Sequence, residues 1–170
     1  MPKQLTNTEL NELLLNVTNH SLHLFTETKY YFQDLYFTGC RSTEPLTISK
    51  WKIIGDKYVL KTHKTEAERS FTKSQLSRSL TYAIENSINP YSWLTFDQLT
   101  GEFRRVIKLA PIWAGDRPAD TYLFRYNRAR QLFEQSNNLL VVMDFFGWHS
   151  PSVASKYITT PLVYDPFRRK

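Results

Sequence analysis

A tyrosine near the end of the chain lies in a stretch whose residue types could carry a reaction. Residues 146–158 bring Trp148, His149 and Tyr157 together with a short amphipathic turn. The phenol of Tyr157 is a potential covalent nucleophile. Taken alone, aromatic residues beside such a turn usually pack into a core. A catalytic interpretation therefore depends on residues elsewhere in the chain.

A second stretch, residues 50–78, is rich in basic side chains. Its positive charge could contact phosphate groups. Alternatively, it forms the charged solvent face of a sheet edge, which lysine commonly protects. The basic residues are Lys50, Lys52, Lys57, Lys61, Lys64, Arg69, Lys73 and Arg78, against Asp56, Glu66 and Glu68.

The composition is that of an ordinary folded domain with a basic bias. The 170 residues are 41% hydrophobic, and 22 Lys and Arg against 16 Asp and Glu give a net charge of +6. This charge suits a polyanionic partner, although many basic proteins bind none. The single cysteine, Cys40, excludes an internal disulfide and a cysteine-based zinc site. The chain has no apolar run long enough to span a membrane and no signal-peptide pattern, which predicts a cytosolic or nuclear-type compartment.

The first part of the chain is predicted to be helical. Residues 6–9 have the form of a capping box, and leucines follow at helical spacing. A second helix is expected from about 22 to 38, ended by Gly39 as a left-handed cap. Pro45 is tolerated only in the first turn of a helix, so a short helix begins there. Arg41 is therefore expected on a connection between two helices.

The middle of the chain predicts a small antiparallel sheet. Strands at 51–54 and 57–62 flank a tight turn, and a third short strand follows at 69–71, with Lys64 on or beside the second turn. The fold class is therefore α+β, mainly α-helical with a three-stranded sheet. Five later helices are expected. The first runs from a cap at 72–75 to about 86, the second from a cap at 95–98 to about 109, and the third from about 119 to 135. The fourth runs from Asn138 to Gly147, and the fifth starts at Ser150 or Ser152 and contains Tyr157.

Four short boxes, in this order, resemble those of the tyrosine recombinases, the phage-integrase-type enzymes. Residues 38–44 (Thr-Gly-Cys-Arg-Ser-Thr-Glu) resemble the family's Thr-Gly-x-Arg-x-x-Glu box, and residues 64–69 (Lys-Thr-Glu-Ala-Glu-Arg) resemble its Lys-Thr-Gly-Lys-x-Arg turn. Residues 122–125 match the His-x-x-Arg box in their arginine, and residues 147–148 match its Gly-Trp step. Each box is common, but the ordered set, which ends on Tyr157, is hard to reach by chance. The resemblance covers about residues 5–158 and implies the tyrosine recombinase catalytic fold.

The resemblance implies DNA cutting and rejoining through a 3′-phosphotyrosyl intermediate. Arg41 and Arg125 would be the catalytic arginines, Tyr157 the nucleophile and Lys64 the general acid for the leaving 5′ oxygen, with Lys61 as its competitor. Without a metal, charge on the phosphate oxygens needs guanidinium groups, which stay charged and bind two oxygens at once. The phosphotyrosyl bond keeps the energy of the broken bond, so no metal and no other cofactor is expected.

Three further positions, Tyr122, Trp148 and His149, allow more than one interpretation of their role. Tyr122 stands where the family usually has His, and its hydroxyl can donate to a phosphate oxygen but cannot act as an imidazole base. His149 is one position late for another usual His, and Trp148 stands where the indole N–H of some members donates to the phosphate. For Trp148 and Tyr122 the alternative interpretation is core packing.

The resemblance also implies organisation and partners. A single catalytic domain over residues 1–170 is expected, without the N-terminal core-binding domain that family members usually carry. The expected partners are double-stranded DNA, two to four copies of the chain on it, and an accessory DNA-binding protein or domain. Residues 159–170 are expected to dock on a neighbouring protomer. The implied setting is the cytoplasm of a bacterial, archaeal or phage-infected cell, on a mobile element, virus or plasmid, with no membrane partner.

Three alternatives stay open at this point. A type IB topoisomerase-like enzyme would use the same site but reseal the same strand. A DNA-binding relative could have lost catalysis, with Tyr122 as the mark of that loss. A structural basic protein would depend on Arg41 and Arg125 only for their charge.

Overall fold

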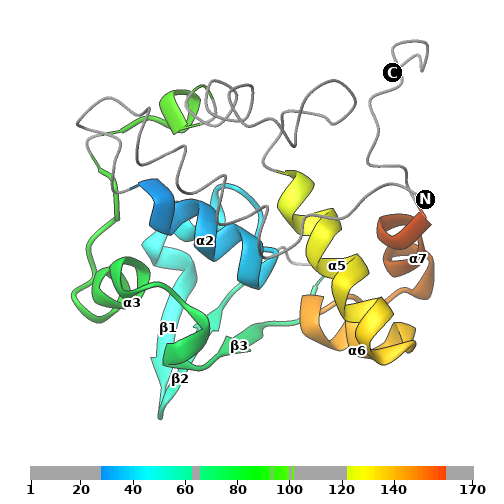
Figure 1. Cartoon of the computed structure of the whole chain (residues 1–170). Helices are drawn as coiled ribbons and strands as arrows, with labels where there is room; N and C mark the ends of the chain where they lie inside the picture. The colour runs from blue at the N-terminus through cyan, green and yellow to red at the C-terminus, as the bar shows by residue number, and fades with distance from the viewer. Residues whose placement is uncertain (1–27, 63–65, 93, 100, 102–121, 160–170) are drawn as a thin grey trace.

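The computed structural model describes residues 28–62, 66–92, 94–99, 101 and 122–159 of the chain. They form helices and a three-stranded antiparallel sheet that lies at one edge of the molecule, which confirms the predicted α+β class (Figure 1). The predicted helix after the capping box at 6–9 lies outside the described residues, as does the predicted tail. None of the helices in the described part of the chain is long and apolar enough to span a membrane.

Helix α2 (Thr28–Thr38) lies within the helix predicted from about 22 to 38 and has an apolar face. Phe32, Leu35 and Tyr36 are buried. The helix ends as predicted at Gly39, which has a φ of +63°, and the amide of Gly39 donates to the carbonyl of Leu35 at 2.9 Å. A Cβ at this glycine would also lie 2.6 Å from the ring of Phe146, so position 39 needs glycine for both reasons.

The sheet follows two short 3₁₀ turns, η2 (Glu44–Leu46) and η3 (Ile48–Lys50). Strand β1 (Trp51–Ile54) pairs with β2 (Lys57–Leu60), which pairs with β3 (Arg69–Phe71), in the order β1-β2-β3. The predicted second strand was two residues too long. Because β3 has only three residues, it pairs with residues 58–60 and offers no partner to residues 61 and 62.

Helix α3 (Arg78–Glu85) starts later than predicted. The capping box of Thr72 and Gln75 exists, but it closes a 3₁₀ turn, η4 (Lys73–Gln75). The helix itself begins after Ser77, whose hydroxyl accepts from the amide of Leu80 at 3.1 Å. The amide and hydroxyl of Ser77 both donate to the buried carboxyl of Asp34, each at 2.7 Å. A contact with α2 therefore fixes this helix start, and a local capping pattern could not reveal it. The predicted capping box at 95–98 also exists, since each of its end residues binds the other's backbone amide, while the helix behind it lies mostly outside the described residues.

Three helices form the C-terminal part: α5 (Tyr122–Ser136), α6 (Leu139–Phe146) and α7 (Pro151–Thr159). Helix α5 packs against α2 and against both later helices (Figure 1). The Asn138 side chain caps α6 by accepting from the amide of Leu140 at 2.9 Å, and Gly147 ends it with a φ of +72°, both as predicted. Helix α7 begins at Pro151, directly after the predicted cap at Ser150.

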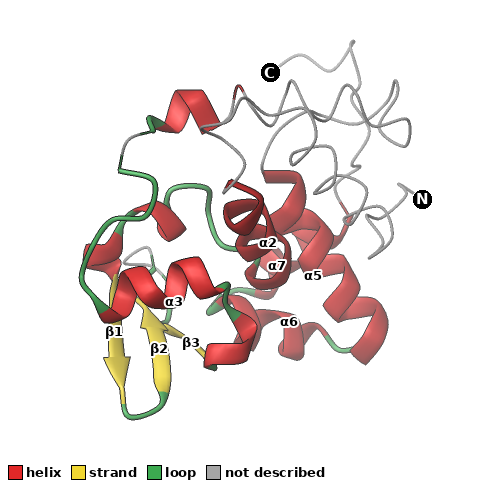
Figure 2. Cartoon of the chain, turned by 60° about the vertical axis from the view of Figure 1, so that its left-hand side comes forward, coloured by secondary structure: helices red, strands yellow, loops and turns green. Residues whose placement is uncertain are grey.

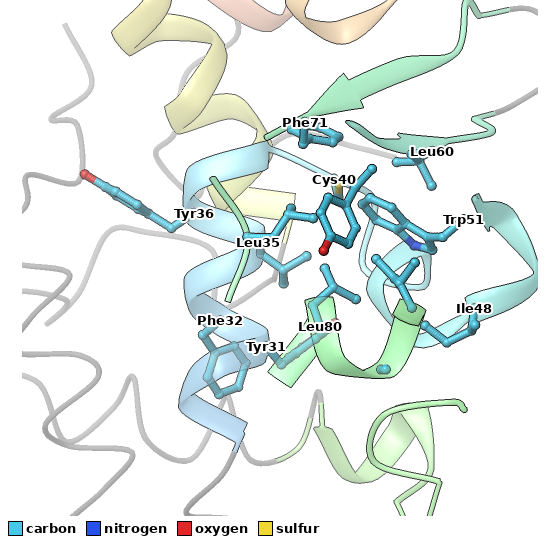
Figure 3. Close-up of a cluster of buried hydrophobic side chains, with 14 of the residues drawn as sticks. Tyr31, Phe32, Leu35, Tyr36, Cys40, Ile48, Trp51, Leu60, Phe71 and Leu80 are labelled. Carbon is cyan, nitrogen blue, oxygen red and sulfur yellow. The ribbon is translucent and has the colours of Figure 1, made fainter. Parts of the chain in front are cut away.

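The core has two parts. Figure 3 shows the larger one, where side chains of α2 meet those of the sheet and α3, and Figure 2 shows α3 lying across the sheet. The smaller one lies among α5, α6 and α7 and holds Ala129, Val142, Phe146, Trp148 and Ala154. The connection after α2, where Arg41 lies, is held near both parts because Gly39 touches Phe146 of the smaller one.

Candidate active site

Arg41 lies on the connection between α2 and η2, as predicted, and contacts two carboxylates. Glu44 accepts from the backbone amide of Arg41 at 3.0 Å and from its Nη1 at 3.3 Å. Glu66 accepts from Nη1 at 2.9 Å and from Nη2 at 2.5 Å. The hydrogen bonds with Glu66 raise the pKa of Arg41 above its ordinary value, although burial acts against this. The guanidinium is therefore charged and is paired with two carboxylates of the protein itself.

Arg125, on α5, is 2% exposed and is the largest fully buried side chain among the described residues. Its Nη1 donates to the carbonyl of Gly39 at 2.8 Å, and its Nε donates to the hydroxyl of Tyr157 at 3.2 Å. Its Nη2 lies 3.7 Å from Oε1 of Glu66. The same carboxylate therefore lies between the two arginines that the sequence singled out.

Tyr157, on α7, is half-buried, and its ring packs against two other aromatic rings. The centroid of the Trp148 ring lies 4.6 Å from that of Tyr157, with an angle of 28° between the ring planes. The centroid of the Tyr126 ring also lies 4.6 Å from that of Tyr157, with an angle of 32°. Its hydroxyl nevertheless reaches Arg125. Both interpretations of this tyrosine thus describe part of the side chain: the ring packs, and the hydroxyl meets a guanidinium.

Trp148 is buried, and its indole N–H lacks a hydrogen-bond partner among the described residues. The ring stacks on Phe146 at 4.3 Å and 9°. A buried N–H without a hydrogen-bond partner lowers the stability of the fold by roughly 1–3 kcal/mol, so the presence of such a group calls for an explanation. A donor kept for a ligand oxygen is one such reason.

His149 is exposed and lies beside Trp148 at a small cavity. The cavity has a volume of about 210 Å³ and is lined by Glu66, Trp148, His149, Ser150 and Val153. Glu66, which lies beside both arginines, and Trp148 therefore line the same cavity.

Two predicted site residues are not placed. Lys64 lies outside the described residues, and Tyr122 is the first residue of α5 with a side chain outside the described part. The competitor Lys61 is exposed directly after β2, where its backbone amide donates to the carbonyl of Lys50 at 2.8 Å. The choice between the two lysines remains a prediction.

The connection between β2 and β3 is docked onto the end of α6. The amide of Ala67 donates to the carbonyl of Gly147 at 2.9 Å, and a Cβ at Gly147 would lie 2.5 Å from the carbonyl oxygen of Ala67. Glycine at position 147 therefore permits this close approach as well as the left-handed helix end. The docking brings Glu66 to the cavity beside Trp148.

Sequence reasoning did not assign roles to three charged residues at this site. Glu44 orients Arg41, and its place in the first box was the available signal. Glu66 stands where the family turn has glycine, so the only signal in the sequence that could have indicated a role for Glu66 was this departure from the family pattern.

Arg69, the third of these residues, is buried on β3 and ties the site together. Its Nε donates to the carbonyl of Phe145 at 2.8 Å, and its Nη2 donates to the carbonyl of Thr38 at 2.5 Å. Burial lowers the pKa of Arg69 to about 10, so it stays protonated at neutral pH. These bonds fix β3 to the segment before Arg41 and to the end of α6.

Comparison with solved structures gives the class of fold. A structure of the XerH site-specific recombinase bound to difH substrate, a pre-cleavage complex, matches with a TM-score of 0.66 at 20% identity, over 94% of this chain and 51% of that one. A lambda integrase dimer bound to a COC' core site matches with a TM-score of 0.65 at 17% identity, over 92% of this chain and 48% of that one.

The protein therefore has the tyrosine recombinase catalytic fold, as the resemblance implied. It spans about half the length of those two chains. No protein-family model and no curated protein matches the sequence. At these identities the similarity concerns the fold, so any activity must be argued from the side chains of the site.

Proposed function

We propose that this chain is a DNA strand transferase, a site-specific recombinase or integrase that cuts and rejoins DNA through Tyr157. The observation that carries the proposal is the convergence at Arg125. Its Nε donates to the hydroxyl of Tyr157, and its Nη2 lies 3.7 Å from a carboxylate that also binds Arg41. A nucleophile and an anion-binding pair of arginines thus meet at one place, which is the arrangement that phosphoryl transfer to a tyrosine requires.

The proposed reaction begins with the scissile phosphodiester held by Arg41 and Arg125. Tyr157 gives its phenol proton to water and attacks phosphorus as the phenolate, a P–O bond to tyrosine forms, and the bond to the 5′ oxygen breaks. The electron pair goes to the leaving oxygen, which takes a proton from Lys64 in this proposal. The 5′-hydroxyl of a second DNA end then gives its proton back to Lys64 and attacks phosphorus, a P–O bond to the 5′ oxygen forms, and the bond to Tyr157 breaks, so that Tyr157 leaves as a phenolate and takes a proton from water. One phosphoester bond replaces another in each step, so no nucleotide is required to supply energy, and Arg41 and Arg125 are proposed to supply the positive charge that a metal could otherwise provide.

The remaining donors are proposed to stabilise charge on the non-bridging oxygens. Two observations support this role for Trp148: its indole N–H has no hydrogen-bond partner among the described residues, and Trp148 lines the same cavity as Glu66. Tyr122 and His149 are proposed as further donors, with His149 at the exposed side of the same cavity. One preorganised donor of this kind typically contributes about 3–4 kcal/mol to lowering the barrier.

The proposed partners follow from the same reaction. The partner is double-stranded DNA, on which two to four copies of the chain assemble, with residues 159–170 docking on a neighbour. The matched XerH and lambda integrase structures are bound to DNA. The net charge of +6 supports a polyanionic partner here too.

Covalent trapping tests the function directly. A pool of duplexes of random sequence, each nicked near a potential cleavage position, is incubated with the protein, and covalent protein–DNA adducts are separated under denaturing conditions. We expect an adduct with the wild-type chain and none with Tyr157→Phe. Tyr126→Phe is the matched control, because its ring lies against Tyr157. An adduct that survives in Tyr157→Phe, or no adduct with the wild type, would contradict the proposal. Ligation to an added second DNA end separates strand transfer from simple resealing.

A further inference from the structure

The anion-binding position between Arg41 and Arg125 is already filled by the protein's own Glu66. We propose that Glu66 is an internal stand-in for the DNA phosphate, so that the site is autoinhibited until DNA displaces the carboxylate. This inference rests on the proposed function and adds a regulatory contact to it.

The carboxylate is bound as a phosphodiester would be. Its two oxygens accept from Nη1 and Nη2 of Arg41 at 2.9 and 2.5 Å, and Nη2 of Arg125 lies 3.7 Å from one of them. A carboxylate and a phosphodiester each carry one negative charge and present two oxygens to the fork of a guanidinium. The two groups therefore compete for the same donors.

The electrostatics favour a charged Glu66 in this position. Burial works against the charge, but the hydrogen bonds and charge of Arg41, followed by the charges of Arg125 and Arg69, outweigh it and lower the pKa of Glu66. The Glu66 side chain is only 9% exposed. A partly buried ion pair of this kind is screened by salt far less than a surface pair. Salt alone should not empty the site, and a well-placed phosphate is needed.

Glu44 makes the exchange possible without loss of geometry. This second carboxylate accepts from the backbone amide and from Nη1 of Arg41, and it is buried. Because Arg41 keeps Glu44 when Glu66 leaves, its guanidinium stays oriented for a new anion. Glu44 therefore acts as the positioning residue and Glu66 as the competitor.

Glu66 can leave by rotation of its side chain. The next residue, Ala67, is fixed to α6 by its hydrogen bond with Gly147, so the backbone there does not need to move. The cavity of about 210 Å³ that Glu66 shares with Trp148 and His149 adjoins the carboxylate and offers it space outside the guanidinium fork.

The test compares Glu66→Gln with Glu68→Gln. Both remove one negative charge, but Glu68 is exposed and pairs with Lys52 instead of the arginines. With the nicked random duplex pool, we expect Glu66→Gln to bind DNA and to form the covalent adduct about 10-fold faster or more than the wild type. That value is the low end for one charged hydrogen bond, converted at 1.36 kcal/mol per tenfold. Glu68→Gln should change either quantity less than twofold.

An adduct rate for Glu66→Gln that equals or falls below the wild-type rate would overturn the inference, because Glu66 would then only position the arginines. If no chain forms an adduct but Glu66→Gln still binds DNA more tightly than Glu68→Gln, the proposed function fails and the occupied anion site stands. If the wild type forms an adduct and Glu66→Gln forms it no faster and binds DNA no more tightly, the proposed function stands and the autoinhibition by Glu66 fails.

Thermal unfolding with inorganic phosphate gives a second measurement that does not need DNA or turnover. Glu66→Gln should have a lower Tm than the wild type without phosphate, because Arg125 loses its carboxylate neighbour. Phosphate should raise the Tm of Glu66→Gln more than that of the wild type or Glu68→Gln. Equal shifts in all three chains would contradict the proposal.

Discussion

Two buried arginines at this site differ in where their donors go. Arg69 and Arg125 are 3% and 2% exposed, and both guanidinium groups lie about 5 Å from three aromatic rings. Arg69 gives its donors to two carbonyls and to the sulfur of Cys40. Arg125 gives one donor to a carbonyl and directs the others toward Tyr157 and Glu66.

Burial and aromatic contacts are common to both arginines, so these features do not separate the structural role of Arg69 from the catalytic role proposed for Arg125. The main chain uses the donors of Arg69, so this residue holds β3, α2 and α6 together. The Nη2 of Arg125 makes no hydrogen bond with any described residue, and its nearest anion is a carboxylate that a substrate could replace. Substitutions should therefore separate stability from reaction at these two positions.

The largest expected effect is on stability, at Arg69. Arg69→Met should lower the free energy of unfolding by about 3–5 kcal/mol, because it leaves the buried carbonyls of Thr38 and Phe145 without donors. Urea denaturation followed by circular dichroism measures this loss. The exposed Arg78 is the matched position, and Arg78→Met should change the free energy by about 0.5 kcal/mol or less. Similar losses in both variants would remove the structural role of Arg69.

The opposite result is expected at Arg125. Arg125→Lys keeps the positive charge but loses the fork, so the rate of adduct formation should fall about 10²–10³-fold, or about 3–4 kcal/mol. The loss in unfolding free energy should be smaller than the loss at Arg69. Arg128→Lys, on the same helix, is the control and should keep the rate. If Arg125→Lys reacts at the wild-type rate while folded, Arg125 is a structural arginine like Arg69.

Trp148 allows a smaller and more selective test. Trp148→Phe keeps an aromatic ring between Phe146 and Tyr157 but removes the unpaired indole N–H. Stability should be nearly unchanged, because no hydrogen bond to a described residue is lost. The adduct rate should fall about 10–100-fold, the value of one hydrogen bond to a charged group. A loss of stability without a loss of rate would favour core packing as the role of Trp148.

The last expected effect depends on pH and concerns the buried carboxyl of Asp34, which pairs with no cation among the described residues. Burial raises the pKa of Asp34 to about 7, although its hydrogen bonds with Ser77 act in the other direction. An unfolded chain releases this proton near pH 4, so between about pH 4 and 7 the folded state binds more protons. Stability should therefore fall as pH rises through this window, by at most about 1.4 kcal/mol per pH unit from this group.

The substitution Asp34→Asn tests whether the Asp34 carboxyl causes this pH dependence of stability. The amide can still accept from the amide of Ser77 and donate to its hydroxyl, so the start of α3 keeps its contacts. Urea denaturation between pH 4 and 8 should show a flatter profile for the variant, with the largest gain over wild type at pH 8. Parallel profiles would mean that another group causes the pH dependence.

The sequence by itself determined the local geometry and the order of the reactive residues. Gly39 and Gly147 end their helices in the left-handed conformation, and Asn138 caps α6, because each of these signals acts within one turn of chain. The ordered boxes likewise singled out Arg41, Arg125 and Tyr157, the last two being 32 positions apart.

Only the tertiary structure decided how these residues meet. The start of α3 depends on Asp34, 43 residues before Ser77, so the local capping box at Thr72 gave the wrong position. The same holds for Glu66, which lies 25 residues from Arg41 in the sequence and contacts it because Ala67 docks on Gly147. Contacts between distant segments arise from packing of the whole core, and no periodicity or spacing in one segment encodes them.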